Sequence, residues 1–507
     1  MFSSVFSATV SGVDGFRVIV EVDVSGGLPC FEVVGMPDTS VREAKHRVRS
    51  AVKNSGFQIP PQRITVNLAP AGLHKEGTQL DLAMAVSLLV ASRQIPSNLL
   101  IREYGFLGEL ALNGSIRPVP GVLAMALALR ESGRKGVVLP MDNQGEVSFL
   151  EGCDVQLSRN LSEVAEFLRG NRPLPGPLKS PPDIQGNATS QIRYNQIKGQ
   201  RAAKRALEIA AAGEHNLLIV GPPGAGKSVL AKALPEIMSK LSQEEAIIVT
   251  KIHSIAGLLP KGAGLLKRRP FRSPHHTVTT TAMIGGGANP KPGEITLAHR
   301  GVLFLDELPE FSPAIINALR QPLEDGFVNI TRAKGTYRFP SRILLAGAMN
   351  PCQCGFWGCE VQECTCTEYR RRQYISRVNG PLLDRIDICM QVQRVDVKDL
   401  SGASLEESGD TVRERVTAAR DLQKQRLEGT GFSTNSEMGP RELSTLLSIS
   451  RSARKLLFDA YNRMRLSARA YYRVIRVATT IADLALSARI EEEHVAEALS
   501  YRQRVLD

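Results

Sequence analysis

Apolar side chains recur with a period of two near the start of the chain and then with the period of a helix. Between residues 16 and 24 every second side chain is apolar, as in a half-buried strand. A helical stripe follows over 40–56 and begins with a Ser-x-x-Glu capping box. A further strand is expected at 63–68 and a further helix at about 80–91. The first 170 residues therefore predict a mixed α/β domain.

The middle of the chain has short runs that are almost entirely apolar, which is typical of strands buried on both faces of a parallel sheet. Such runs occur at 216–220, 302–305 and 342–348, separated by helical patterns. The predicted fold class is α/β multidomain. The predicted organisation is an α/β domain at 1–170, a Pro-rich linker at 171–190, an α/β domain at 191–399 and a helical domain at 400–507.

A glycine-rich loop lies between the run at 216–220 and a predicted helix at 228–238. It consists of Gly221, Pro222, Pro223, Gly224, Ala225, Gly226, Lys227 and Ser228. This is the G-x-x-x-x-G-K-[ST] pattern, in which backbone N–H groups surround phosphates, the lysine neutralises them and the serine binds Mg²⁺. A surface turn that happens to contain Lys-Ser is the alternative, but the strand before it and the helix after it favour an ATP–Mg²⁺ site.

Two further polar positions follow predicted strands of the same domain. Asp306 and Glu307 end the run at 302–305, where the first acid would hold Mg²⁺ through water and the second would orient or deprotonate the attacking water. Asn350 lies just beyond the run at 342–348, at the edge where ligands bind in such sheets. The alternative for the two acids is an ordinary strand end exposed to solvent.

Five of the eight cysteines are crowded into 352–366. Two C-x-C pairs bracket Cys359, and four thiolates at this spacing suit tetrahedral Zn²⁺. The favoured ligands are Cys352, Cys354, Cys364 and Cys366, with Cys359 as a fifth candidate. Unmetallated or redox-active thiols are the alternative. Clustered cysteines suit a reducing compartment, and there is no signal-peptide pattern or apolar run of membrane-spanning length, so we expect a cytoplasmic protein without membrane contact.

Three short sequence segments in the first domain resemble the proteolytic domain of Lon proteases. They lie at 64–70, 75–77 and 106–119. Lon enzymes use a serine activated by a lysine, and alignment on these segments places Gln79 at the serine position and Leu123 at the lysine position. An amide and an isobutyl group can neither attack a peptide carbonyl nor accept a proton, so we expect a Lon-like fold without protease chemistry.

The remaining motifs resemble the magnesium-chelatase and replicative-helicase branch of the AAA+ ATPases. In that branch Asn350 corresponds to a residue that senses the γ-phosphate, and Arg385 to an arginine finger supplied to a neighbouring subunit. The alternative is that Arg385 pairs with an adjacent aspartate of its own subunit. Arg469, Arg473 and Arg476 share a predicted helix face. Arg469 and Arg476 are both candidates for the family's second sensor, whereas Arg473 is expected to lie on a solvated face.

The net charge of +12 raises the expectation of an anionic partner. In the magnesium-chelatase and replicative-helicase branch of the AAA+ ATPases, an insertion between the two ATP motifs and a hairpin at the position before Asn350 point into a central pore. The candidate DNA contacts at these places are Lys334, Arg332, Arg338, Arg268 and Arg269. The alternative is solvated charge, and His275 and His276 between the ATP motifs are expected to be structural or DNA-facing.

The order of all these features is similar to the ComM/YifB family of magnesium-chelatase-like AAA+ ATPases. The resemblance implies a hexamer formed on ATP or DNA binding, with single-stranded or branched DNA as the partner. It further implies a helicase that promotes branch migration of recombination intermediates during natural transformation. Three alternatives stay open: a motor that inserts metal or remodels a protein partner, a Lon-like ATP-dependent protease, and a nucleotide-gated scaffold in which Glu307 is dispensable.

Overall fold

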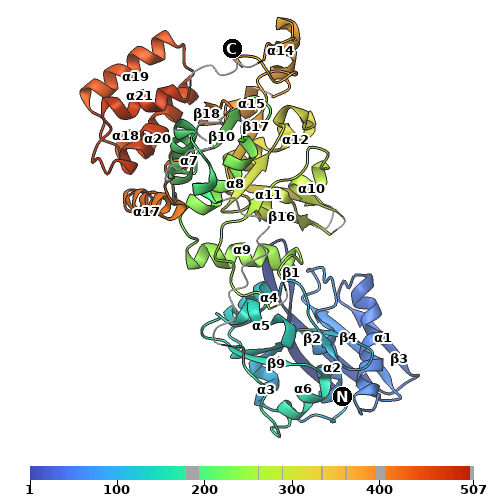
Figure 1. Cartoon of the computed structure of the whole chain (residues 1–507). Helices are drawn as coiled ribbons and strands as arrows, with labels where there is room; N and C mark the ends of the chain where they lie inside the picture. Colours follow the sequence, from blue (N-terminus) through green and yellow to red (C-terminus); the bar gives the residue numbers. More distant parts are fainter. Residues whose placement is uncertain are drawn as a thin grey trace.

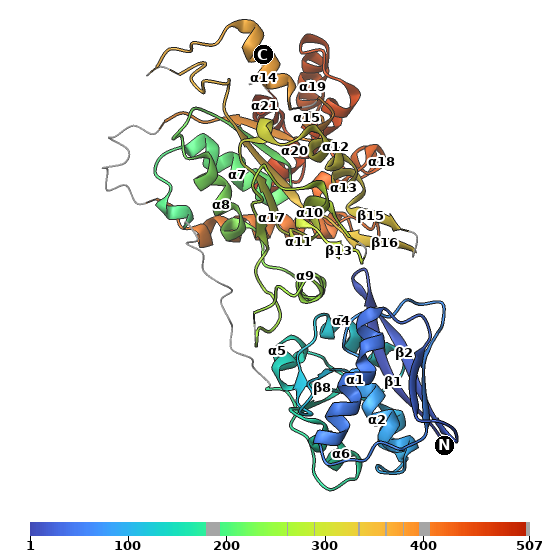
Figure 2. The ribbon, with the colours of Figure 1, turned by 90° about the vertical axis from the view of Figure 1, so that its right-hand side faces the viewer.

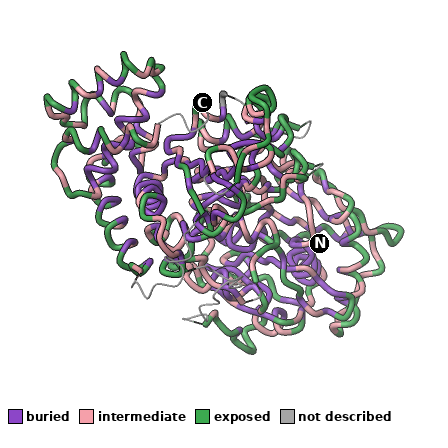
Figure 3. The backbone as a smooth tube through the Cα atoms, turned by 45° about the horizontal axis from the view of Figure 1, so that its top comes forward, coloured by how far each residue is buried: buried purple, intermediate pink, exposed green. Residues whose placement is uncertain are grey.

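The computed structural model of the chain contains an N-terminal α/β domain, a central α/β domain and a C-terminal helical domain (Figure 1). The described residues are 1–178, 193–260, 262–287, 289–332, 335–359, 362–378, 380–394 and 406–502. Most of the predicted linker, and Lys334 at the tip of the predicted hairpin, lie outside these residues. Buried backbone is concentrated in the sheets and the helices that cover them (Figure 3).

The N-terminal domain is built on a seven-stranded sheet with the order β3-β4-β2-β1-β5-β8-β9. Its strands are β1 (Phe2–Ser11), β2 (Asp14–Ser25), β3 (Cys30–Val34), β4 (Arg63–Ala69), β5 (Tyr104–Phe106), β8 (Gly136–Pro140) and β9 (Asp154–Ser158), and β6 (Glu109–Leu110) pairs separately with β7 (Ile116–Arg117). Its helices are α1 (Thr39–Asn54), α2 (Asp81–Ala91), α3 (Leu99–Glu103), α4 (Val122–Glu131), α5 (Gln144–Val147) and α6 (Leu161–Leu168), with a 3₁₀ turn at Met141–Asn143.

The predicted elements of this domain are present with small changes at their ends. The strand expected at 16–24 is β2, which pairs with an N-terminal strand, β1, that the pattern did not reveal. Helix α1 begins two residues earlier than its capping box suggested, because the Asp38 side chain accepts a hydrogen bond from the Val41 amide at 2.7 Å. The N-terminal cap is therefore Asp38 and not Ser40.

The central domain has a parallel five-stranded sheet with the order β11-β14-β17-β10-β18. These strands are β10 (Leu217–Val220), β11 (Phe271–Arg272), β14 (Val302–Leu305), β17 (Leu344–Met349) and β18 (Ile388–Gln391). The three strands predicted from apolar runs are β10, β14 and β17, and every residue in them is buried. Helices on both faces leave no side chain of these strands exposed, which explains why polar residues do not alternate in them.

Helices and two hairpins surround this sheet. The helices are α7 (Arg201–Gly213), α8 (Lys227–Ile237), α9 (Gln243–Ile255), α10 (Thr280–Ile284), α11 (Glu294–Leu297), α12 (Pro313–Ala318), α13 (Arg320–Asp325), α14 (Glu368–Ser376) and α15 (Gly380–Leu383), with 3₁₀ turns at Tyr194–Gln196 and Leu308–Glu310. The hairpins are β12 (Gly285–Gly286) with β13 (Lys291–Pro292), and β15 (Phe327–Arg332) with β16 (Gly335–Pro340). Both hairpins lie at the positions where the resemblance predicted pore elements.

The C-terminal domain is helical, as predicted, and packs against α7 of the central domain. Its helices are α17 (Gly409–Arg426), α18 (Pro440–Thr445), α19 (Arg451–Arg463), α20 (Ala468–Leu484) and α21 (Glu492–Ser500), with a 3₁₀ turn at Asn435–Glu437. Buried residues of α17 and α20 share one hydrophobic core with α7, α8 and four strands of the central sheet. Among the described residues, no helix is both long and apolar enough to cross a bilayer.

Helix α9 provides polar contacts between the N-terminal and central domains (Figure 2). Ser254 donates to the buried carboxylate of Glu146 and accepts a hydrogen bond from the Gly121 amide at 2.9 Å. One turn earlier, Lys251 contacts Asp14 in the β1–β2 hairpin at 2.8 Å. These specific polar contacts on one helix therefore help to join the two domains.

Candidate nucleotide site and metal cluster

The phosphate loop joins the C-terminal end of β10 to the first turn of α8. Gly224 and Gly226 have φ angles of 79° and 82°, which lie in the left-handed region that side chains disfavour. Lys227 and Ser228 are the first two residues of α8, so the unpaired N–H groups of the helix face the loop. Backbone donors and the helix dipole together make this end of α8 suitable for phosphate.

Lys227 and Asn350 meet directly, although 123 positions separate them. The Lys227 Nζ donates to the Asn350 Oδ1 at 2.9 Å and to the carbonyl oxygen of Gly221 at 2.7 Å. The contact forms because β17, which precedes Asn350, pairs in parallel with β10. Burial lowers the pKa of Lys227, and the nearby carboxylates of Asp306 and Glu307 oppose that shift. This cation and amide lie where they would contact the outer phosphates of a nucleotide.

The two acids at the end of β14 have different environments. The Asp306 carboxylate accepts a hydrogen bond from Ser228 Oγ at 2.6 Å, and hydroxyl and carboxylate oxygens are the ligands that Mg²⁺ prefers. The Glu307 side chain is 61% exposed and its φ is 52°, so this residue projects away from the strand. The donor set therefore fits Mg²⁺ at Ser228 and Asp306 and leaves Glu307 available to a water molecule.

Sequence reasoning did not connect His276 with this site. Its Nδ1 lies 3.7 Å from the Glu307 Oε2, and its ring packs against the His275 ring with the centroids 4.0 Å apart and the planes at 35°. The contact follows from the sheet order, because β11 lies next to β14 and the histidines follow β11. The spacing of the histidines alone carries no signal of this contact, since it depends on which strands are neighbours.

The four favoured zinc ligands form one cluster. The sulfur atoms of Cys352, Cys354, Cys364 and Cys366 all lie within 4.8 Å of one another. Cys359 does not belong to this group, although it lies in the same loop. A cluster of four thiols at this separation can hold a metal ion.

The predicted arginine finger lies at the opposite edge of the sheet from the phosphate loop. A cavity of about 470 Å³ is lined by Arg385, Arg469 and Arg476 together with Asn216, which immediately precedes β10. The phosphate loop follows the other end of β10, roughly 13 Å away at 3.3 Å per residue. In this chain, therefore, the two candidate sensor arginines and Arg385 gather on one face, away from their own Lys227.

The partners of these arginines differ from the alternatives considered for them. Arg385 forms an ion pair with Glu324 of α13. Arg473 is 4% exposed and donates to the carbonyl oxygens of Leu383 and Ile386, so it is structural rather than solvated. Burial is the main cause that lowers the pKa of Arg473, to about 10.

The candidate DNA contacts divide into exposed and buried residues. Arg332 and Arg338 are exposed on the β15–β16 hairpin, and Arg268 is also exposed. Arg338 stacks on the Phe327 ring at 3.7 Å from its centroid. The Arg269 side chain is only 3% exposed, which removes it from the predicted DNA contacts.

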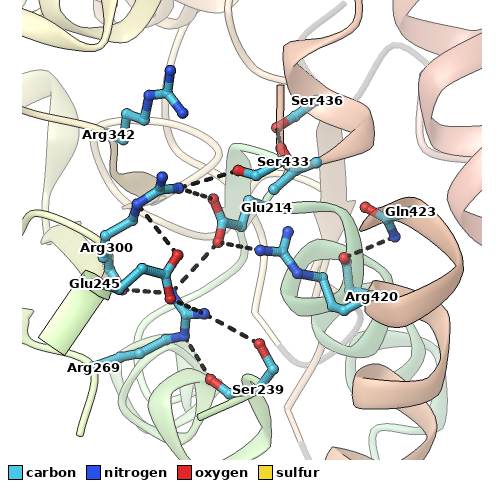
Figure 4. Close-up of polar contacts among 12 residues, drawn as sticks. Glu214, Ser239, Glu245, Arg269, Arg300, Arg342, Arg420, Gln423, Ser433 and Ser436 are labelled. Carbon is cyan, nitrogen blue, oxygen red and sulfur yellow. Dashed lines mark hydrogen bonds and ion pairs between the residues drawn. The ribbon is translucent and has the colours of Figure 1, made fainter. Parts of the chain in front are cut away.

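Arg269 belongs to a buried ion cluster between the central and helical domains (Figure 4). Glu214 lies in its centre, 3.1 Å from Arg420 of α17, 3.5 Å from Arg269 and 3.9 Å from Arg300. Glu245 contacts Arg300 at 3.4 Å. Burial alone would raise the pKa of Glu214, but the arginines outweigh this effect and lower it to about 2. The cluster therefore fixes the helical domain on the central domain.

Glu214→Gln is expected to destabilise the protein by about 3–5 kcal/mol at neutral pH, because it leaves buried guanidinium groups without their carboxylate. A carboxyl with a lowered folded-state pKa contributes stability above its unfolded value of 4.5 and loses it as the pH falls toward 2. The difference in unfolding free energy between the two proteins should therefore shrink over that window. Denaturant titrations across it measure this, with the exposed Glu32→Gln as the matched control; a constant difference would contradict the prediction.

The Lon-like domain has no nucleophile at the position expected from the resemblance. Gln79 is buried and donates to Thr9 Oγ1 at 3.0 Å and to the Glu76 carbonyl oxygen. Leu123 is fully buried in α4. Both side chains have packing roles, and neither provides a base or a nucleophile at these positions.

A phosphate loop, an acidic strand end, a polar residue after the next strand and an attached helical domain together define an AAA+ ATPase domain. Three family descriptions match the chain: "Subunit ChlI of Mg-chelatase" at 20–143, "Magnesium chelatase, subunit ChlI" at 193–400 and "Magnesium chelatase, subunit ChlI C-terminal" at 406–502.

Similarity to known proteins extends over the full length. The chain is 41% identical to YifB of Escherichia coli over 501 residues, which cover 99% of this chain and 97% of that protein. It is 39% identical to Competence protein ComM of Haemophilus influenzae over 511 residues, covering 99% and 97%. Lon protease 2 of Bacillus subtilis is 30% identical over 154 residues, 29% of this chain and 27% of that protein. The chain belongs to the ComM/YifB family of magnesium-chelatase-like AAA+ proteins, and this membership points to ATPase chemistry.

Proposed function

We propose that the protein is an ATP-driven ring motor acting on DNA, a helicase that promotes branch migration of recombination intermediates during natural transformation. The observation that carries the proposal is the division of the ATP machinery between two faces. Lys227, Ser228 and Asp306 lie at one edge of the sheet, whereas Arg385 lies at the other. A complete site then requires two subunits, as in a closed ring in which each subunit supplies its arginine face to the next pocket. We propose a hexamer.

Each residue has a defined task in this mechanism. Lys227 and the loop amides bind the phosphates, and Asn350 fixes the position of the Lys227 ammonium group. Ser228 and Asp306 would hold Mg²⁺, which neutralises charge on the phosphates when bound. Glu307 orients the attacking water and accepts its proton.

The arginine face of the neighbouring subunit would complete this pocket. We propose that Arg385 approaches the γ-phosphate and that Arg469 or Arg476 contacts the same nucleotide. Arg385 must first leave Glu324, which is itself half exposed and can return to solvent. Assembly would thus switch Arg385 from an ion pair within the subunit to a phosphate contact between subunits.

Zinc is the metal proposed for the cysteine cluster. The donor set is composed only of sulfur, which favours a soft ion such as Zn²⁺ over Mg²⁺ or Ca²⁺. Four protein ligands would close the coordination shell, so the ion would be structural and would not bind a substrate.

DNA is proposed as the partner because the chain is basic and its β15–β16 hairpin presents two exposed arginines. Arg332 is at the end of β15, paired with Gly335, and Lys334 lies between them in sequence. Side chains at such a tip would contact phosphates without reading the base sequence. The similarity to Competence protein ComM agrees with a DNA-related role.

The proposal predicts that single-stranded or branched DNA stimulates ATP hydrolysis and that salt weakens the effect, because bound cations are released from DNA on binding. The measurement is the ATPase rate with and without each DNA at low and at physiological salt. Arg332→Ala should weaken the apparent DNA affinity several-fold while keeping the basal rate. Arg489→Ala, an exposed arginine of the helical domain, is the matched control.

The magnesium chelatase matches favour a second candidate, a motor that remodels a protein partner. The same ATPase assay distinguishes the DNA motor from the motor that remodels a protein partner. An ATPase that no DNA stimulates at either salt concentration would contradict the DNA motor and favour the protein-directed one.

A further inference from the structure

We propose that a zinc ion bound by Cys352, Cys354, Cys364 and Cys366 holds the residues of the nucleotide site in position, so that ATP turnover depends on the metal. The inference rests on the proposed ATPase function and adds a positioning role for the cysteine loop. The loop begins directly after Asn350 and ends at α14.

The separations between the sulfur atoms agree with a tetrahedral ion. Sγ of Cys352 lies 3.3 Å from that of Cys354 and 3.7 Å from that of Cys364, and the Cys354–Cys364 separation is 3.6 Å. Zn–S bonds of about 2.3 Å require S–S separations of about 3.8 Å in a tetrahedron. Backbone amides of Cys354 and Cys366 also donate to sulfur atoms of the cluster at 3.4 Å, which stabilises thiolates.

One end of the loop fixes Asn350. Only Pro351 separates Asn350 from the first ligand, Cys352, which is fully buried. The Asn350 carboxamide in turn accepts the hydrogen bond from Lys227. A displacement of Cys352 would therefore move the amide that positions the phosphate-binding lysine.

The middle of the loop lies directly on the phosphate loop. A Cβ atom on Gly355 would lie 2.7 Å from Pro223 Cδ and 3.8 Å from Asn350 Cγ, so the glycine allows the two loops to touch. Its φ of 88° also favours glycine. The Gly355 amide donates to the Cys352 carbonyl oxygen at 3.0 Å, which links this contact to the metal cluster.

The loop has little else to keep it ordered. Among its described residues between Cys352 and α14, Gly355 alone is buried. A segment that buries so few apolar side chains cannot offset the entropy of ordering its backbone, and a metal ion can. The metal would thus hold Gly355 against Pro223 and Cys352 beside Asn350.

The test uses the full-length protein with both Cys364 and Cys366 changed to serine. These ligands are remote in sequence from Asn350, so the substitution touches the nucleotide site only through the metal. Bound zinc is measured with a chromophoric chelator, the dissociation constant with a fluorescent ATP analogue, and kcat and KM with ATP. We expect zinc to be lost, the dissociation constant to rise and kcat to fall about 10- to 100-fold.

Cys359→Ser is the matched control, because Cys359 lies in the loop but outside the cluster. It should keep one zinc per chain and its kcat within about twofold of the parent. Gly355→Ala is a second variant that retains all four ligands, and it should keep zinc yet lower kcat through its clash with Pro223.

The following outcomes would contradict the proposed positioning role of zinc. If the parent protein contains no zinc, the proposed metal site is contradicted. If the double variant lacks zinc but keeps its kcat and KM, the proposed dependence of ATP turnover on the metal is contradicted. If the double variant does not fold, unchanged kinetics in Gly355→Ala contradicts the positioning role. A zinc-loaded parent that binds ATP but never hydrolyses it would instead contradict the proposed ATPase function.

Discussion

Glu307→Gln is expected to leave ATP binding and ring formation intact while lowering kcat about 10²- to 10⁴-fold. Glutamine keeps the size and polarity of the side chain but cannot accept the proton of the attacking water. The phosphate contacts do not change, because Lys227 and Ser228 have their own partners in Asn350 and Asp306. The loss should therefore appear in kcat and not in the ATP dissociation constant.

Glu310→Gln is the matched control for this substitution. Glu310 lies three residues later, is 45% exposed and contacts Arg377, not the phosphate loop. It should hydrolyse ATP like the parent protein. Full turnover by the Glu307 variant would exclude Glu307 as the base and favour a nucleotide-gated scaffold, whereas loss of ATP binding would mean that Glu307 has a structural role.

The parts of the site that follow strands in sequence could be predicted without the structure. The phosphate loop, Asp306 and Asn350 each come directly after an apolar strand, and parallel strands place their C-terminal ends at one edge of the sheet. Their convergence thus follows from chain direction alone. The contact between His276 and Glu307 could not be predicted, because it depends on the lateral order of β11 and β14.

The burial of charged side chains also could not be predicted from the sequence. Arg269 lies in a run of basic residues and looks like a nucleic-acid contact, but Glu214 and Glu245 neutralise it in a desolvated cluster. Neither partner is near it in sequence. Similarly, the spacing of Arg469 and Arg476 predicts a shared helix face, while the packing of α20 decides that this face lies away from the chain's own phosphate loop.

Arg385→Ala is expected to lower kcat about 10³- to 10⁵-fold, the effect typical of removing an arginine finger. ATP binding to the subunit's own loop should change little, because Arg385 lies at the other edge of the sheet. The control is Arg377→Ala, a half-exposed arginine paired with Glu310, which should retain the parent rate.

Mixing two inactive variants tests whether Arg385 acts on a neighbour. An Arg385→Ala subunit keeps an intact pocket, and a Glu307→Gln subunit keeps an intact arginine face. In an equal mixture with random order around a ring, about a quarter of the interfaces join an intact pocket to an intact arginine, so a comparable fraction of the parent ATPase rate should return. If Arg385 acted within its own subunit, no interface would be repaired and the mixture would stay as inactive as its components. Restored hydrolysis would therefore establish that the active site is built from two chains, which is the property that requires this ATPase to assemble.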